Sequence, residues 1–315
     1  MTTVANPRPF AGQGLRAWTR RRTTSSEKRL PLSRQLLLQG LCLLVAFTVL
    51  FPILWILSLS VDPRGLSRPD GLNLIPPGVT FEAYGNVIAQ PTSNPVSFWE
   101  LARNSFLVAA STAILSVGVG VTAAYAFSRL DFPGRGALMI AILGVLMLPA
   151  VATIAPLFIM LTRVQVGEFV LGRTLAGVII AVVSGALPFA IWNLKGYLDT
   201  IPRDLEEAAA VDGASRNQSF FRVVLPLATP ALAVTAFLGY IAGWTEFYFS
   251  VIFLSDPGQF TLALALNGMV GQYATQTPWS EFSAFAIMFA LPVSIVYIFL
   301  QKYIIGGLAV GGVKG

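Results

Sequence analysis

The chain has 315 residues, of which 55% are hydrophobic and 11% are charged, with a mean hydropathy of +0.71 and a formal net charge of +6. Soluble domains carry about 25% charged residues, so this composition excludes an ordinary soluble protein. Histidine is absent and Cys42 is the single cysteine, which excludes a disulfide framework, a thiolate metal site and a histidine proton shuttle.

A basic tail covers residues 1–34, where Arg20, Arg21 and Arg22 stand together. Binding to nucleic acid is one interpretation of this cluster. A tail that sets membrane orientation accounts for the same residues, because Lys and Arg are retained on the cytoplasmic side, and we therefore expect no nucleic-acid partner. The next apolar run is too long for a cleaved signal peptide, and no small-residue cleavage site follows Ser60.

Six apolar runs are long enough to cross a hydrocarbon core of roughly 30 Å as helices. Because lipid offers no partners for backbone polar groups, each run must satisfy its own hydrogen bonds as a helix. We therefore predict an all-α polytopic membrane protein with six transmembrane helices between residues 35 and 304. The six runs are 35–60, 104–128, 137–161, 174–194, 224–250 and 282–304.

Prolines are expected to interrupt these spans, as in broken helices that line cavities. They are Pro52, Pro149, Pro156, Pro188 and Pro292.

Basic residues are distributed unevenly between the connections. Sixteen of the 21 Lys and Arg residues lie in the two tails, the second-to-third connection and the fourth-to-fifth connection. The positive-inside rule then places both termini and the loop 199–226 in the cytoplasm. The segment 61–103 is expected outside, packed over the helix ends, and the segment 251–281 is also expected outside.

The loop 199–226 concentrates charge within an apolar chain. A first short helix is predicted to start at Thr200 and Pro202 and to stop at Gly213, which reaches the left-handed conformation at low cost. A second helix is predicted to start at Ser215, where Ser-x-x-Gln to Gln218 forms a capping box. Pro226 closes the unit.

Two interpretations suit such a helix pair. It could lie on the lipid headgroups, but surface helices usually turn Lys and Arg toward anionic lipid. Between Asp199 and Asp212, five acidic residues oppose one Arg, and the alanines offer little area to bury in a membrane. Docking to a protein partner is therefore favoured.

The same residues resemble the EAA loop of ABC-importer permeases. Glu207-Ala208-Ala209 is followed after three residues by Gly213, and after nine more by Val223 and the pair Leu225-Pro226. Only Val223, in place of Ile, departs from the family pattern. The resemblance implies the type I ABC-importer permease fold, with the loop docked in a groove of a separate cytoplasmic ATPase subunit.

The resemblance also assigns residues to this docking site. Glu207 and Gly213 would be its fixed points, and Asn217, Phe220 and Phe221 would lie on the inserted face. The coupling residues implied are Glu207, Ala208, Ala209, Asp212, Gly213, Ala214, Asn217, Phe220, Phe221, Leu225 and Pro226.

The Gly-rich tail 305–315 resembles the terminus of permeases of the maltose/maltodextrin (MalG) type. Half of its last ten residues are glycine, which allows the backbone to thread a narrow interface without obstruction by side chains; disorder at a chain end is the alternative. The resemblance implies that the tail enters the interface between two ATPase subunits. The residues concerned are Gly311, Gly312, Val313, Lys314 and Gly315.

The stretch before the last span, with Gln272, Tyr273 and Trp279, resembles the same group of permeases. The resemblance implies a loop that enters the cleft of an extracytoplasmic sugar-binding protein. A passive surface loop is the alternative.

The spans contain one clear acidic residue, Glu246, which weakens the hypothesis of an ion-coupled carrier. No phosphate-binding GxxxxGK[ST] loop, nucleophile motif or metal cluster is present. We therefore expect a non-catalytic subunit that binds no cofactor or metal itself, with ATP and Mg²⁺ on a partner ATPase.

An aromatic and amide path would suit an uncharged sugar. Tyr240, Trp244 and Tyr248 recur every four residues and are expected to share one face of the fifth helix, while Trp192 and Asn193 lie near the inner end of the fourth. Packing between helices or an interfacial aromatic belt is the alternative.

The sequence therefore predicts one permease of a sugar importer in the bacterial inner membrane. Its partners would be a second permease, two ATPase subunits, an extracytoplasmic solute-binding protein and membrane lipid. A permease for another oligosaccharide or for glycerol phosphate is the alternative within the family, and an ion-coupled carrier is the alternative outside it.

Overall fold

The computed structural model describes residues 31–64, 74–271 and 277–311. The chain divides into two units, residues 1–51 and 52–315, and the helices discussed together below lie in the second. The structure in chain order consists of α1 (Leu32–Ser60), α2 (Glu82–Ala89), α3 (Phe98–Arg129), α4 (Arg135–Leu146), α5 (Ala150–Thr162), β1 (Gln165–Val166), β2 (Phe169–Val170), η1 (Leu171–Arg173), α6 (Leu175–Leu198), α7 (Asp204–Val211), α8 (Arg216–Ser219), η2 (Phe220–Val224), α9 (Leu225–Leu227), α10 (Thr229–Trp244), α11 (Tyr248–Phe253), η3 (Pro257–Gln259), α12 (Leu262–Gly268) and α13 (Trp279–Gly311).

Five helices within the described ranges are long and apolar enough to cross a membrane: α1, α3, α6, α13 and the run from α10 through α11. The count becomes six if α4 and α5 form one span, but these two helices meet at an angle of 108°. The third predicted span, 137–161, is therefore not a straight helix. Pro149 lies at this break, as the residue before α5.

The other four span prolines do not interrupt their helices. Pro52, Pro156, Pro188 and Pro292 all lie inside continuous helices, so the prediction that they break the spans is wrong. Membrane helices tolerate proline because neighbouring groups satisfy the freed backbone carbonyl. The fifth span breaks where no proline stands, since α10 ends at Trp244 and α11 begins at Tyr248.

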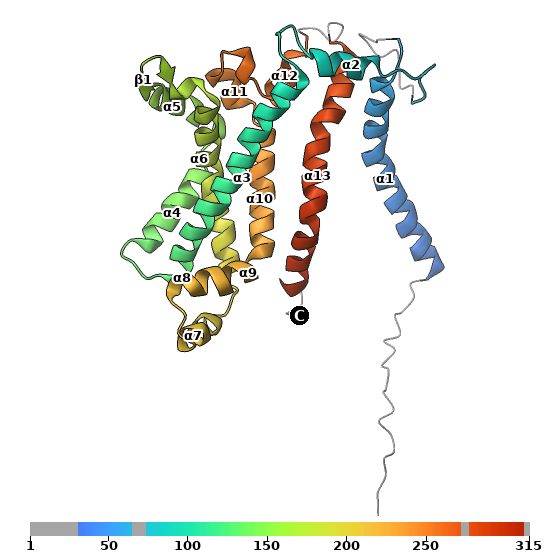
Figure 1. Cartoon of the computed structure of the whole chain (residues 1–315). Helices are drawn as coiled ribbons and strands as arrows, with labels where there is room; N and C mark the ends of the chain where they lie inside the picture. Colours follow the sequence, from blue (N-terminus) through green and yellow to red (C-terminus); the bar gives the residue numbers. More distant parts are fainter. Residues whose placement is uncertain (1–30, 65–73, 272–276, 312–315) are drawn as a thin grey trace, which may run out of the picture. The chain divides into compact units, whose positions relative to one another are not determined.

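The bundle is centred on α3, which packs along α6 and α10 (Figure 1). Gly239 and Gly243 lie one turn apart on α10 and form a GxxxG pair. A Cβ at Gly243 would lie 2.7 Å from the Cα of Ala109, and one at Gly239 would lie 3.1 Å from the Cα of Ala113. Small residues at this spacing let two helix backbones approach closely, which is how membrane helices associate when lipid removes the hydrophobic driving force.

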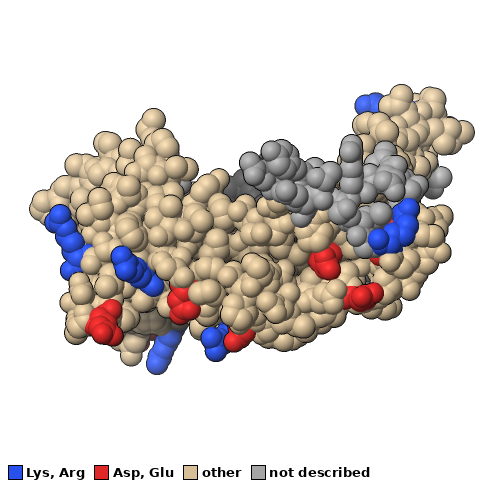
Figure 2. Space-filling view, turned by 90° about the horizontal axis from the view of Figure 1, so that it is seen from above, with Lys and Arg blue, Asp and Glu red and all other residues tan. Residues whose placement is uncertain are grey.

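The end of the bundle that carries α2 and α12 is closed by short helices, as expected for the segment 61–103. Ala83 and Val87 of α2 are buried in one cluster with Trp244 and Phe285. α3 begins at Phe98, six residues before the predicted start, because Ser97 and Glu100 form a capping box. Figure 2, seen from this end, shows isolated charged side chains of both signs rather than one patch of a single sign.

The opposite end of the bundle carries α7, α8 and α9, and α13 also ends there (Figure 1). We call residues 199–226 the coupling loop. α13 continues through Gly311, so residues 305–311 of the predicted Gly-rich tail are helical.

Candidate functional site

The first helix of the coupling loop, α7, begins later than predicted. It starts at Asp204 and is preceded by Arg203, whose side chain makes no capping hydrogen bond. Thr200 instead donates its hydroxyl to the carbonyl of Tyr197 at the end of α6, so Thr200 and Pro202 belong to the connection. Three acidic residues, Asp204, Glu206 and Glu207, occupy the first turn, where the positive end of the helix dipole favours them.

The turn after α7 has the predicted chemistry. Gly213 has a φ of +86° with no atom near its missing side chain, so the backbone conformation, and not crowding, requires glycine. The amide of Gly213 donates to the carbonyl of Ala210 (3.0 Å), and the amide of Ala214 donates to the carbonyl of Ala209 (2.9 Å). This pair of hydrogen bonds is a Schellman motif, which ends α7 and turns the chain.

The second helix, α8, starts as the sequence indicated. The amide of Gln218 donates to Ser215 Oγ (3.3 Å), and the amide of Ser215 donates to Gln218 Oε1 (2.8 Å), which confirms the capping box. The helix then widens into the π-helix η2, where the amide of Leu225 reaches back to the carbonyl of Phe220. Pro226 has no amide hydrogen, so it cannot continue the normal ladder at this point.

The outer face of the loop is available to a partner. None of the eight residues of α7 is buried, and Glu207, Ala208 and Asp212 are exposed. In α8 and η2, Asn217 is exposed and the side chain of Phe221 is 62% exposed. A phenylalanine exposed to this extent beside unpacked alanines is a candidate contact for a protein partner.

Phe220 does not belong to this outer face. Its side chain is 7% exposed, and its ring lies 4.7 Å from that of Tyr125 in α3, within a cluster that includes Leu194 and Val224. The prediction that Phe220 inserts into the ATPase is therefore wrong. Two adjacent phenylalanines therefore differ in their surroundings: Phe220 is buried against the bundle, and Phe221 is exposed.

A polar cluster fastens the coupling loop to the end of α3. Glu206 accepts a hydrogen bond from Tyr125 Oη (2.8 Å) and forms an ion pair with Arg129 Nε (2.5 Å). Arg129 also donates through Nη2 to the carbonyl of Ile201 (2.9 Å), and Arg203 donates to the carbonyl of Ser128 (2.9 Å). We call these residues, Tyr125, Ser128, Arg129, Arg203 and Glu206, the polar joint.

The polar joint was missed in the sequence, where Arg129 counted only toward membrane orientation. Glu206 and Arg129 are 77 residues apart, and no local sequence pattern indicates their contact. The only available signal was a pair of adjacent glutamates, of which the family pattern assigns a role to Glu207 alone.

Asp199 joins the same region from the end of α6. It accepts hydrogen bonds from Ser128 Oγ (2.6 Å) and Lys195 Nζ (2.5 Å). Partial burial opposes ionisation, but the hydrogen bonds from Lys195 and Ser128 outweigh it, and the pKa of Asp199 is lowered from its ordinary value. This carboxylate therefore stays charged at neutral pH and binds the end of α6 to the end of α3.

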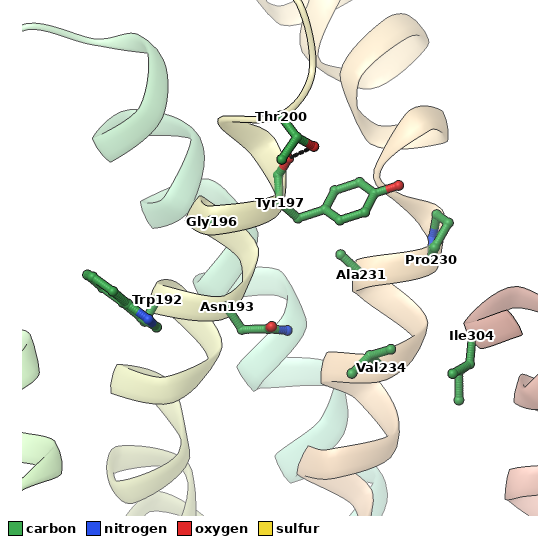
Figure 3. Close-up of a pocket in the computed structure, with 9 residues that line it drawn as sticks. All are labelled: Trp192, Asn193, Gly196, Tyr197, Thr200, Pro230, Ala231, Val234 and Ile304. Atoms are coloured by element: carbon green, nitrogen blue, oxygen red, sulfur yellow. Dashed lines mark hydrogen bonds between the residues drawn. The ribbon is translucent and has the colours of Figure 1, made fainter. Parts of the chain in front are cut away.

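The candidate residues on the fourth helix line a cavity of about 460 Å³ at the coupling-loop end of the bundle (Figure 3). Asn193 points toward α10, where its amide donates to Thr235 Oγ1 (3.0 Å), while the indole of Trp192 points away from α10. Tyr197 and Ile304 complete the walls from α6 and α13. The Asn193 amide thus already serves a contact between α6 and α10.

The aromatic residues of the fifth span do not form one exposed stripe. Tyr240 and Trp244 are buried and stacked, with ring centroids 5.7 Å apart, and Trp244 donates its indole N–H to the carbonyl of Phe289 in α13. Tyr248 is exposed and begins α11, beyond the end of α10. The prediction that all three share one helical face is therefore wrong for Tyr248.

Glu246 lies in the break between α10 and α11. Both of its carboxylate oxygens are engaged, because they accept hydrogen bonds from the amides of Phe249 and Ser250 and from the hydroxyl of Ser250. This carboxylate satisfies the free amides at the start of α11, which is the usual role of a capping acid.

Several predicted residues lie outside the described part of the chain. These are Gln272 and Tyr273 in the proposed binding-protein loop, and Gly312, Val313, Lys314 and Gly315 in the tail. Trp279 is described as the first residue of α13, where its ring packs edge-on against Phe282.

Residues 116–309 match the protein family described as "Binding-protein-dependent transport system inner membrane component". The chain is 35% identical over 289 residues to the maltose/maltodextrin transport system permease protein MalG of Escherichia coli strain K12, covering 87% of this chain and 94% of that protein. It is 33% identical over 288 residues to the trehalose/maltose transport system permease protein MalG of Thermococcus litoralis, covering 90% and 98%.

The fold has a counterpart among solved structures. A chain of a bacterial ABC transporter involved in the import of the acidic polysaccharide alginate superposes with a TM-score of 0.70 at 25% identity. The alignment covers 85% of this chain and 95% of that one. The structural similarity therefore extends over most of the chain.

Proposed function

The chain belongs to the family of binding-protein-dependent transport system inner membrane components, and from this premise we propose how it works within a transporter. It is a permease subunit of an ABC sugar importer like MalG, with the type I importer fold. We propose that it pairs with a second permease, that two ATPase subunits bind the coupling loops, and that an extracytoplasmic binding protein delivers the sugar.

The observation that carries this proposal is the geometry of the coupling loop. Its two short helices are turned by a glycine in the left-handed conformation, present an unpacked outer face and are fastened behind to α3. An exposed helix pair that is bonded to the end of a bundle can pass the movement of a bound partner to the transmembrane helices. ATP and Mg²⁺ would belong to that partner, which supplies the energy.

The basic residues support an orientation with the coupling loop in the cytoplasm. Arg129, Arg135, Lys195, Arg203 and Arg222 all lie at or near this end of the bundle. Positive charge is retained on the cytoplasmic side of inner-membrane proteins, so we propose that the C-terminus is cytoplasmic as well.

Three contacts follow for the remaining candidate residues. We propose that Glu207, Asn217 and Phe221 meet the ATPase, that the tail ending at Gly315 reaches the interface between the two ATPase subunits, and that the loop before Trp279 meets the binding protein. Trp192, Asn193 and Tyr248 remain candidates for sugar contact, whereas Tyr240 and Trp244 serve helix packing.

We propose an uncharged oligosaccharide of the maltose/maltodextrin type as the substrate. Two of the relatives carry maltose in their names, one together with maltodextrin and the other with trehalose. An ion-coupled carrier is disfavoured, because Glu246, the acidic side chain in the break of the fifth span, already has both oxygens occupied by the start of α11.

Uptake by vesicles tests the class of transporter. A complex purified through a tag on this chain, reconstituted with its binding protein and labelled maltose, should accumulate sugar only when ATP is supplied to the ATPase side. An uncoupler should leave the uptake unchanged, because no ion gradient drives it. Uptake that persists without ATP and collapses with the uncoupler would instead identify an ion-coupled carrier. ATP-driven uptake of another oligosaccharide or of glycerol phosphate in place of maltose would correct the substrate alone.

A further inference from the structure

Apolar packing contributes little to the attachment of α7, the first helix of the coupling loop, to the bundle. α7, described along its whole length, buries no residue. A hollow of about 340 Å³ lies between the end of α3 and this helix, with Tyr125, Arg129, Ala210 and Ser219 among its walls. α7 is therefore held beside α3 by bonds that bridge a gap and not by a packed interface.

Those bonds converge on one glutamate. Each oxygen of Glu206 has its own partner in α3, Arg129 for Oε1 and Tyr125 for Oε2. The side chains of Arg129 and Glu206 are 7% and 15% exposed, so solvent screens their attraction only weakly. Arg129 uses its remaining nitrogens on Ser128 Oγ and on the carbonyl of Ile201, which fixes the guanidinium in one orientation.

Tyr125 connects both halves of the coupling loop to the same turn of α3. Its hydroxyl reaches Glu206 in α7, and its ring packs against Phe220 after α8. A displacement of either short helix therefore acts on α3 at one position. α3 in turn packs along α6 and α10, so its movement is passed to the centre of the bundle.

We propose that the Glu206–Arg129–Tyr125 contact is the joint through which movement of the docked ATPase is transmitted to the transmembrane helices, with Glu206 and Arg129 as positioning residues. This inference rests on the proposed function, because it assumes that the ATPase moves the loop. Docking and transmission are then separate tasks of neighbouring glutamates: Glu207, which is exposed, is left for the partner, and Glu206 bonds to α3.

The joint predicts a specific defect. In Glu206→Gln, the docking face is unchanged, so the ATPase should still bind and hydrolyse ATP. Arg129 loses its counter-charge, so the contact between α7 and α3 weakens. Part of the movement of the coupling loop is then not transmitted to α3. The number of sugar molecules transported per ATP should fall roughly fivefold or more, as expected when a coupling energy of a usual size is lost.

Two variants complete the measurement. Tyr125→Phe keeps the ring against Phe220 and removes only the hydroxyl bond, so its sugar-to-ATP ratio should lie between those of the wild type and Glu206→Gln. Asp204→Asn is the matched control, since it removes an exposed charge from the same turn of α7, and its ratio should equal that of the wild type.

The outcomes separate this proposal from the function on which it rests. If the Glu206→Gln complex assembles and transports as much sugar per ATP as the wild type, the proposed role of the contact is refuted. Equal losses of sugar uptake and ATP hydrolysis would refute it as well. If Glu206→Gln does not assemble, an unchanged ratio in Tyr125→Phe would overturn it and a lowered ratio would support it. Wild-type uptake that needs no ATP would instead refute the proposed function.

Discussion

Gly213→Pro is expected to abolish ATP-dependent sugar uptake while leaving the helical bundle in the membrane. Proline is fixed near a φ of −65°, whereas Gly213 has a φ of +86°. The substitution also removes the amide that donates to Ala210, and it disfavours the present conformation of Asp212, at φ −75° and ψ 6°, because it would precede a proline. The Schellman turn is lost, and α7 and α8 no longer present one face. Uptake by reconstituted vesicles and recovery of the ATPase with the tagged permease measure both effects.

Gly213→Asn is the control for this variant. Asparagine reaches the left-handed region more readily than other residues with a side chain, and no atom lies within 4 Å of the missing Cβ. Most of the uptake should therefore remain. Wild-type uptake in the proline variant would mean that the turn has no part in coupling.

Gly243→Val is expected to disrupt the bundle itself. A Cβ at this position would lie 2.7 Å from the Cα of Ala109 and 2.9 Å from the carbonyl oxygen of Val108, both in the backbone of α3. Backbone cannot yield as a flexible side chain does, so α10 must move away from α3. Overpacking of this kind costs about 3 kcal/mol. The purified variant should show a lower melting temperature and poor recovery from the membrane.

Gly118→Val provides the comparison for the close approach of α3 and α10. Gly118 lies within α3, and no atom lies within 4 Å of its missing Cβ. The same substitution should therefore change the melting temperature only slightly. Equal stability of the two valine variants would contradict the close contact between α3 and α10.

The sequence predicted best those features that depend on neighbouring residues. Gly213 as a left-handed stop and the capping box of Ser215 and Gln218 need only a few adjacent positions, and both are confirmed. The membrane helices also follow from local composition, because a span must satisfy its own backbone. The GxxxG pair of Gly239 and Gly243 was readable in the same way, as small residues one turn apart, but was not recognised.

Contacts between distant segments were not predictable in this way. Arg129 and Glu206 carry no local mark of their pairing, and Tyr240 and Trp244 have the same spacing whether they line a path or pack against α13. Apolar residues face both lipid and neighbouring helices in a membrane bundle, so periodicity does not distinguish the two. The burial of Phe220 depends on its contact with Tyr125, a distant residue of α3, which the local pattern did not reveal.

The docking of the coupling loop on an ATPase is tested most directly by cross-linking. In a chain with Cys42 replaced by serine, a cysteine introduced at Asn217 or Phe221 should be captured by the ATPase of the assembled transporter through a short thiol-reactive cross-linker. A cysteine at the exposed Val166, in β1 at the opposite end of the bundle, should not be. Capture from both loop positions and not from Val166 is the predicted result; no capture from the loop, or equal capture from Val166, would contradict it.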